Sequence, residues 1–258
     1  MMNTIIVPTD FSLNAENAIR YAIQLARQRN IKIVYAHIYS TPIITSEAGL
    51  VYVDSLSESI KQKAERTLSE NIDKIYNSLG MNRNLLLSEF EVVEALTISS
   101  GLEKIIKKYK ADIVIMGTHG ATGLKKIFLG SNAVDVIENI DIPVLTVPGN
   151  SSYNNFSSIA YASDFKDIDT EMGAVIDFAK LFEANLNVIH IDYSKSIKDF
   201  DNISPILQKW QKQKDYDKIN FHFLQSGKDS KPAEQLRSIL ENINTDLLIM
   251  FHKHRSFG

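Results

Sequence analysis

The chain has 258 residues, of which 44% are hydrophobic and 23% are charged, and its formal net charge is −3. This composition is typical of a globular protein, and the charge gives no support for a nucleic-acid partner held by bulk electrostatics. Cysteine is absent, which excludes disulfides, thiolate metal sites and cysteine nucleophiles. The first residues do not read as a signal peptide, and no apolar run approaches the roughly 18 residues that span a bilayer. We therefore expect a soluble, cytoplasmic protein with no membrane partner.

Strands and helices alternate in the predictions for the first 148 residues. Runs of β-branched and apolar residues predict strands at 3–8, 31–39, 84–93, 111–117 and 142–148. Apolar residues at helical spacing predict helices at 12–30, 56–79, 96–110 and 130–140. Ser12 or Asn14 is the expected cap of the first helix. This alternation predicts a mostly parallel five-stranded sheet covered on both faces. The strand order expected for it is 3-2-1-4-5, which is assumed and does not follow from the alternation.

A polar, aperiodic segment, GNSSYNNFSS at 149–158, predicts a linker, and after it the opening of the chain repeats. Asp10-Phe11 aligns with Asp164-Phe165, and His37 aligns with His190. We expect two Rossmann-like α/β units of this kind.

The expected boundaries of these two units are 1–149 and 156–258. The second unit is expected to be degenerate and incomplete at its C-terminal end. Its equivalents of the helix at 130–140 and of the strand at 142–148 are missing. A sheet without its last strand exposes an edge.

Four of the 11 glycines fall within residues 117–130. In an open parallel sheet, ligands bind beyond the C-terminal ends of the strands, where the strand order reverses. The loops PTDF after the first strand and GTHGATG after the fourth would then face one another. Gly117 and Gly120 would let the backbone approach a ligand, and Gly130-Ser131 would start a helix whose free N–H groups favour an anion. Alternatively, the glycines only make tight turns and Ser131 is only a cap.

Two common nucleotide motifs are absent. The chain has no GxxxxGK[ST] loop, and PTDFS follows its first strand in place of GxGxxG. The spacing Gly117-x2-Gly120-x9-Gly130-Ser131 instead resembles the ATP-binding signature of the universal stress proteins, G-x2-G-x9-G-[ST]. PTDFS and ADIVIMGTHG also resemble that family. The resemblance covers residues 3–148 and recurs more weakly in 157–254, and the tandem arrangement is itself a known form of the family.

The resemblance implies an ATP site, with Mg²⁺ as an accompanying ion. Asp10 would bond the adenosine, Ile38 would contact adenine, and the start of the helix at 130 would bind the β- and γ-phosphates. The complete implied set is Pro8, Thr9, Asp10, Ile38, Met116, Gly117, His119, Gly120, Gly130, Ser131, Asn132 and Ala133. Asn132 departs from the family, which usually has valine there. In the second half Phe251 aligns with Gly117 and His254 with Gly120, so that half is not expected to bind ATP in the same way.

The histidines give little support for a metal site. His252 and His254 are more typical of a basic tail than of a ligand pair. His37 and His190 recur at equivalent strand ends, which favours a shared structural role in bonding the loop after the first strand. Whether His119 touches a ligand or only orders its turn stays open.

The leading hypothesis is a tandem universal stress protein whose first half binds ATP in a regulatory or protective role. No residue stands out as a general base or nucleophile, so at most slow ATP hydrolysis is expected. One alternative is an interaction module without nucleotide. A nucleotidyl-transfer enzyme is a weaker alternative, because the HIGH-like and SGGxDS motifs are both absent. The resemblance also implies a homodimer that pairs through the strand at 142–148.

Overall fold

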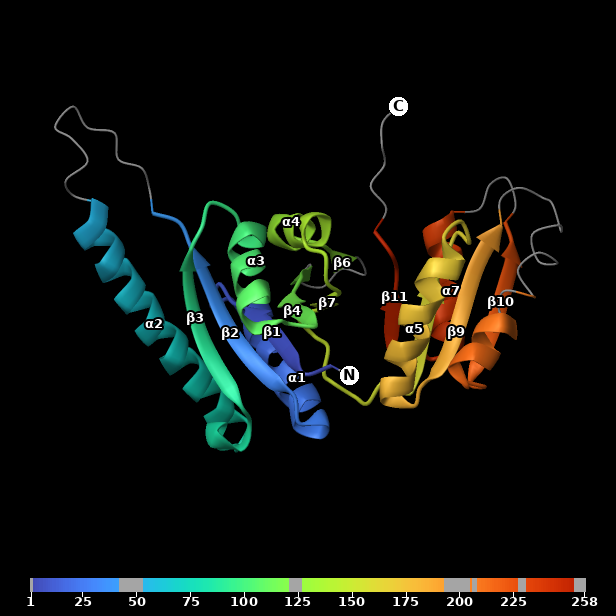
Figure 1. The fold of residues 1–258 in the computed structure, drawn as a ribbon, viewed down its shortest axis with the longest axis horizontal. Coiled ribbons are helices and arrows are strands. Elements are labelled where there is room, and N and C mark those ends of the chain that lie inside the picture. The colour runs from blue at the N-terminus through green and yellow to red at the C-terminus, as the bar shows by residue number, and fades with distance from the viewer. Residues whose placement is uncertain are drawn as a thin grey trace, which may run out of the picture. The chain divides into compact units, whose positions relative to one another are not determined.

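The structure, a computed structural model, describes residues 2–41, 53–120, 127–192, 205, 208–226 and 231–252. The chain divides into two compact units, Met1–Tyr153 and Asn154–Gly258, and each is an α/β unit with its own sheet (Figure 1). Residues 121–126 lie outside the described residues, and they include Lys125 and Lys126, which we expect to supply positive charge near the phosphate site.

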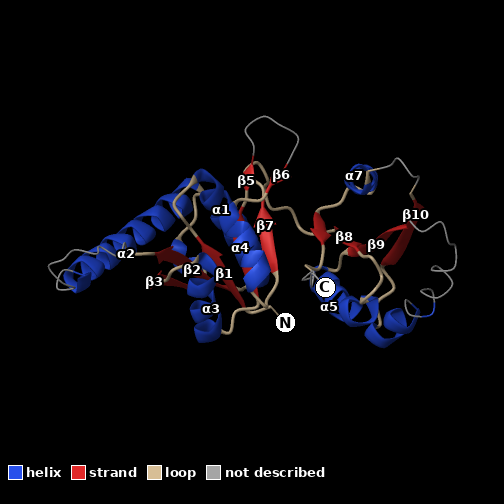
Figure 2. Ribbon diagram, turned by 90° about the horizontal axis from the view of Figure 1, so that it is seen from above, coloured by secondary structure: helices blue, strands red, loops and turns tan. Residues whose placement is uncertain are grey.

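The first unit contains a five-stranded sheet whose order, β3-β2-β1-β4-β7, confirms the predicted 3-2-1-4-5 arrangement. All its strand pairs are parallel. The strands are β1 (Thr4–Pro8), β2 (Lys32–Tyr39), β3 (Ser88–Glu94), β4 (Ile113–Gly117) and β7 (Val144–Val147). The helices are α1 (Leu13–Arg29), α2 (Val53–Ser78), α3 (Ile98–Tyr109) and α4 (Ser131–Asn139). Helices α1 and α2 contact each other on one face of the sheet, and α3 and α4 contact each other on the opposite face (Figures 1 and 2).

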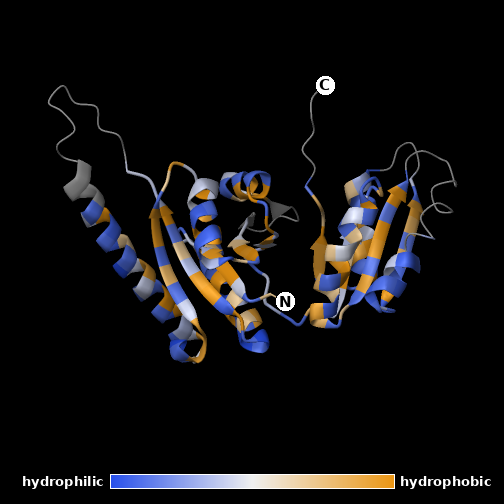
Figure 3. Cartoon of the chain, in the orientation of Figure 1, coloured by the Kyte–Doolittle hydropathy of each residue, from blue (hydrophilic) through white to orange (hydrophobic). Residues whose placement is uncertain are grey.

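Burial explains why these segments become central strands and covering helices. All five residues of β1 are buried, as expected for a parallel strand with helices on both faces. Helix α1 buries Ala18, Ala22 and Ala26 completely, and these small side chains bring the helix close to the sheet. Ser12 caps α1, since its side chain accepts a hydrogen bond from the amide of Ala15. Figure 3 shows the same concentration of hydrophobic residues in the strands of both units.

Two local predictions for the first unit were wrong or incomplete. The strand predicted at 84–93 begins only at Ser88, because Asn82 caps a 3-10 turn at Arg83–Leu85. The apolar run there is largely solvent-facing, with Leu85 67% and Leu87 71% exposed. The glycine-rich loop also contains an unpredicted antiparallel ribbon, β5 (His119–Gly120) with β6 (Ile127–Phe128).

The second unit contains a smaller parallel sheet of four strands, β10-β9-β8-β11. Its elements are β8 (Ser158–Ala162), α5 (Ile168–Phe182), β9 (Asn185–Asp192), β10 (Ile219–Gln225), α7 (Pro232–Asn242) and β11 (Leu247–Ile249). The order repeats the first four positions of the first sheet, so the prediction of two related sheets is confirmed, the second having fewer described strands. Trp210, the only tryptophan of the chain, donates from its indole N–H to Asp169 of α5 at 3.0 Å.

The two units repeat the geometry of the loop that follows their first strand. Nδ1 of His37 lies 2.8 Å from the carbonyl oxygen of Thr9, and Nδ1 of His190 lies 2.8 Å from that of Ser163. Phe11 has a φ of 64° and Phe165 a φ of 66°, and each ring packs against its own histidine. The predicted structural role of these histidines is confirmed.

His190→Phe tests how much this repeated contact stabilises the second unit. The variant keeps an aromatic ring against Phe165 and loses the hydrogen bond to Ser163, so we expect a loss of about 1 kcal/mol in the free energy of unfolding. Urea unfolding followed by Trp210 fluorescence measures it. An unchanged midpoint would show that the hydrogen bond adds no net stability.

The first part of the predicted linker is docked on α1. Nδ2 of Asn17 donates to the carbonyl oxygens of Pro148 and Ser151, at 2.8 and 2.9 Å. The Tyr153 ring is buried, packs edge-on against Tyr21 and donates its hydroxyl to Gln28 at 3.0 Å. The chain after β7 therefore follows one face of α1 up to Tyr153, within the segment predicted as a linker.

Asn17→Ala is expected to release this docked segment. Loss of the two hydrogen bonds lowers the cost of local opening by about 1–2 kcal/mol, which corresponds to roughly tenfold faster chymotrypsin cleavage after Tyr153. Asn71→Ala, which removes an amide from α2, serves as the control. Equal cleavage rates in the two variants would contradict the docking role of Asn17.

Candidate functional site

A pocket of about 380 Å³ opens at the C-terminal edge of the first sheet. The end of β2, the loop between β3 and α3, and the start of α4 form its wall. Its lining residues are Ile38, Tyr39, Ser40, Ala95, Leu96, Thr97, Ile98, Ser131, Asn132 and Asp135. The structure thus brings together three of the predicted site residues, Ile38, Ser131 and Asn132, from elements far apart in the sequence. No pattern in the sequence pointed to the part of the wall that precedes α3.

The N-terminus of α4 differs from those of α1 and α3 in having no side-chain cap. Its N-cap residue is Gly130, with a φ of −68° and a ψ of 159°. Thr97, in contrast, forms a reciprocal capping box with Ser100 at the start of α3. The first N–H groups of a helix carry a partial positive charge and bind anions when no side chain occupies them. Ser131 and Asn132 are exposed at this end of α4.

Two predicted site residues, Met116 and Ala133, belong to the apolar core and lie outside the described lining of the pocket. Met116 is 6% exposed and Ala133 is 2% exposed, and both lie in one cluster with residues of β1, β2 and α3. Ile38 packs against the same cluster. Because the Ala133 side chain is buried there, only its backbone N–H can serve a ligand.

The loop after β1 is ordered by its own side chains. Thr9 is buried, and its hydroxyl accepts a hydrogen bond from the Phe11 amide at 3.0 Å. Asp10 is exposed, and its carboxylate accepts one from the Ser12 amide at 3.0 Å. Pro8, Thr9 and Asp10 do not line the described pocket, so their predicted ligand contacts stay predictions.

Gly117 has a packing role that the sequence did not reveal. A Cβ at this position would lie 2.5 Å from the carbonyl oxygen of Asn14, a backbone atom of α1. The glycine therefore lets α1 approach the end of β4. Its approach to a ligand stays a prediction, as do the contacts of His119 and Gly120, which the structure places in β5 without describing their side chains.

Gly101 was missed by the sequence analysis and bears directly on the pocket. A Cβ there would lie 2.7 Å from the nearest side-chain atom of Ile38. A glycine inside a helix lowers the stability of the helix by about 1 kcal/mol relative to alanine. Its presence in the sequence of α3 could therefore have indicated that another element packs closely there.

Gly101→Ala is expected to disturb the pocket more than the fold. The gain in helix propensity, about 1 kcal/mol, offsets much of the crowding, while Ile38 must move to make room. We expect a change in melting temperature of no more than about 3 °C and about fivefold weaker ligand binding by calorimetry. Unchanged affinity would show that the position of Ile38 is unimportant for the ligand.

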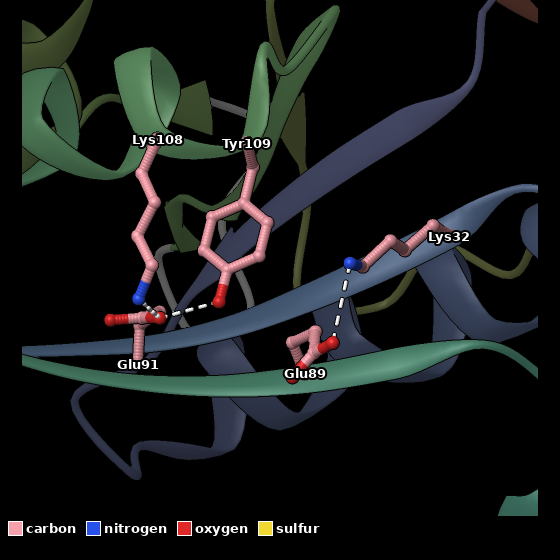
Figure 4. Close-up of polar contacts among 5 residues, drawn as sticks. All are labelled: Lys32, Glu89, Glu91, Lys108 and Tyr109. Carbon is pink, nitrogen blue, oxygen red and sulfur yellow. Dashed lines mark hydrogen bonds and ion pairs between the residues drawn. The ribbon is translucent and has the colours of Figure 1, made fainter.

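Polar contacts join the C-terminal end of α3 to the neighbouring strands β2 and β3 (Figure 4). Glu91 of β3 accepts hydrogen bonds from Lys108 and from the Tyr109 hydroxyl. Nζ of Lys32 lies 3.3 Å from Glu89 and 4.8 Å from the centre of the Tyr109 ring. Partial burial, and the Glu91 carboxylate beside it, raise the pKa of Tyr109, so the phenol stays protonated as a donor at neutral pH.

The structure defines an α/β protein with a pocket at the C-terminal edge of its first parallel sheet. Residues 1–148, more than half of the chain, match the universal stress protein family, and the chain belongs to that family.

Two similar relatives are universal stress proteins of Methanocaldococcus jannaschii. MJ0531 is 29% identical over 143 residues, covering 55% of this chain and 80% of the relative. MJ0577 is 28% identical over 159 residues, covering 59% of this chain and 98% of the relative.

Among solved structures, a universal stress protein from Archaeoglobus fulgidus DSM 4304 has the same fold across nearly the whole chain. The TM-score is 0.69 at 19% sequence identity, and the match covers 97% of this chain and 87% of that one. In the described part of our chain, no helix has the length and hydrophobicity needed to cross a membrane.

Proposed function

We propose that the first unit binds an adenine nucleotide, with ATP as the expected ligand, and that the protein is a nucleotide-responsive regulator or protector in the stress response. The observation that carries the proposal is the uncapped N-terminus of α4 in the wall of the pocket. A polyphosphate is the ligand chemistry that such a helix start favours.

In this proposal the phosphates lie at the amides of Ser131, Asn132 and Ala133, with the Ser131 hydroxyl as a further donor. The adenine lies against Ile38, whose apolar surface joins the core. The contacts assigned to Asp10, Gly117, His119 and Gly120 follow from the family resemblance. Mg²⁺ would accompany the phosphates and neutralise part of their charge.

We propose binding rather than fast turnover as the role of the site. Asp135, the one carboxylate among the residues that line the described pocket, is held by α3 through two hydrogen bonds from Ser99. A general base must reach the attacking water, and a carboxylate held in this way is poorly placed for that role. At most slow hydrolysis is expected, in a cytoplasmic protein.

Calorimetric titration of ATP with Mg²⁺ into the full chain tests the proposal. We expect saturable binding at about one site per chain, because only the first unit carries the glycine signature. Two equivalent sites would contradict the assignment to the first unit. No saturable binding would favour the alternative, an interaction module without nucleotide.

We propose that the second unit has a structural role and does not bind ATP in the same way as the first. Phe251, which aligns with Gly117, contacts Tyr161 edge-on with ring centres 5.9 Å apart. Glu171, which aligns with Asn17 of the first unit, accepts a hydrogen bond from the Tyr161 hydroxyl. The second unit thus has side chains that contact Tyr161 at the two positions where the first unit has the glycine and the docking amide.

We also propose that two copies of the chain pair through β7. This strand is hydrogen-bonded to β4 and lies at the edge of the described first sheet, where a strand of a second copy can add. Sedimentation velocity is expected to show a dimer, and Thr146→Pro, which disrupts pairing at this strand, is expected to shift the population to monomer. A monomeric unaltered protein would contradict this proposal.

A further inference from the structure

Asp135 is a pocket-lining carboxylate that the sequence analysis did not identify. It lies on α4 in the same wall as Ser131 and Asn132. Its Oδ2 accepts a hydrogen bond from the Ser99 amide at 2.9 Å, and its Oδ1 accepts one from the Ser99 hydroxyl at 3.0 Å. The side-chain amide of Asn139 also donates to Oδ1, at 3.2 Å.

These contacts place a fixed negative charge at the N-terminus of α3. Ser99 is the second residue of α3 and is 5% exposed, so its amide is one of the donors that a helix start offers to an anion. Thr97 accepts the hydrogen bond from the next amide, that of Ser100. Two helices therefore begin at the pocket, and a side chain of the protein already occupies the anion position of one of them.

We propose that Asp135 is a specificity-determining residue, whose carboxylate confines the ligand's phosphates to α4 and disfavours phosphate chains whose charge no cation neutralises. The inference rests on the proposed nucleotide site. Like charges across a partly desolvated pocket repel, and the repulsion grows with each phosphate that no cation neutralises. The ligand favoured by this wall is a nucleotide of low phosphate charge or a magnesium complex of ATP.

A purely structural role for Asp135 makes a different prediction. If the carboxylate only joins α4 to α3, its replacement lowers stability and changes the affinities for AMP and ATP by the same factor. The diagnostic quantity is therefore the ratio of the two affinities, with and without Mg²⁺.

The experiment compares the unaltered chain with Asp135→Asn by calorimetry, using AMP and ATP, each in EDTA and in excess Mg²⁺. Asn139→Ala removes a neighbouring donor, and Glu138→Gln makes the same charge change on α4 outside the pocket lining. We expect Asp135→Asn to raise the affinity for ATP relative to AMP about tenfold in EDTA and about twofold in Mg²⁺, and Glu138→Gln to leave the ratio within about twofold.

Equal changes for AMP and ATP would overturn the inference, and so would weaker ATP binding by Asp135→Asn in Mg²⁺, which would identify Asp135 as a magnesium ligand. If the unaltered chain binds neither nucleotide, the proposed function itself fails. Should Asp135→Asn fold poorly, Asp135→Ser, which also removes the charge, gives the same comparison of ATP and AMP affinities in EDTA and in Mg²⁺. An unchanged ratio in that variant would overturn the inference in the same way.

Discussion

Gly117→Ala is expected to destabilise the first unit by about 3 kcal/mol, a decrease in melting temperature of about 10 °C. The added Cβ would lie 2.5 Å from the carbonyl oxygen of Asn14 and 2.7 Å from its carbonyl carbon. Both are backbone atoms at the start of α1, so no rotamer change relieves the contact. Either α1 must move away from β4, or the end of β4 must shift.

Thermal unfolding followed by circular dichroism measures this effect, and Gly101→Ala is the matched control. Its Cβ meets the side chain of Ile38 in place of a backbone atom, so that variant should melt close to the unaltered protein. A melting temperature of Gly117→Ala within about 2 °C of the unaltered value would contradict the packing role. A larger residue at Gly117 would disrupt the fold and so abolish ligand binding indirectly. Such a variant therefore cannot test the site.

Ser131→Asp is expected to abolish nucleotide binding while preserving the fold. A carboxylate in the first turn of α4 interacts favourably with the helix dipole and occupies the position proposed for a phosphate. Stability should stay level or rise by about 0.5 kcal/mol, and ATP affinity should fall at least about a hundredfold.

Ser131→Ala distinguishes the contribution of the Ser131 hydroxyl to ATP affinity from that of the backbone amides of α4. Removing one hydrogen-bond donor should weaken ATP binding by only about fivefold, because the amides of α4 remain. Calorimetry of the three proteins gives the comparison. If Ser131→Asp binds ATP as tightly as the unaltered chain, the phosphates do not lie at this helix.

Local periodicity was sufficient to predict the fold of the first unit. The β-branched runs and the helical spacing of alanines in α1 identify the strands and the helix, while the strand order was an assumption that the structure confirms. The repeated loop made the role of His37 and His190 visible in both units. The prediction of the strand at 84–93 failed because hydrophobic leucines there face solvent, which a pattern of residue types does not report.

The site was harder to predict because its wall depends on contacts between distant residues. Asp135 and Ser99 belong to different helices, and the close contact of Gly101 with Ile38 joins a helix to a strand. Gly117 could be identified as unusual from the sequence, although the packing of Asn14 against it could not. Sequence spacing reveals which residues share a face of one element, and these features depend on how elements approach one another.

The most direct test of the central claim is a titration of the ¹⁵N-labelled chain with Mg²⁺-ATP, followed through its amide resonances. We expect the amides of Ser131, Asn132 and Ala133 to show the largest downfield shifts, as is typical of N–H groups that donate to phosphate. The amides after β8 in the second unit should stay unchanged. Largest shifts in the second unit, or no shifts at the start of α4, would contradict the central claim.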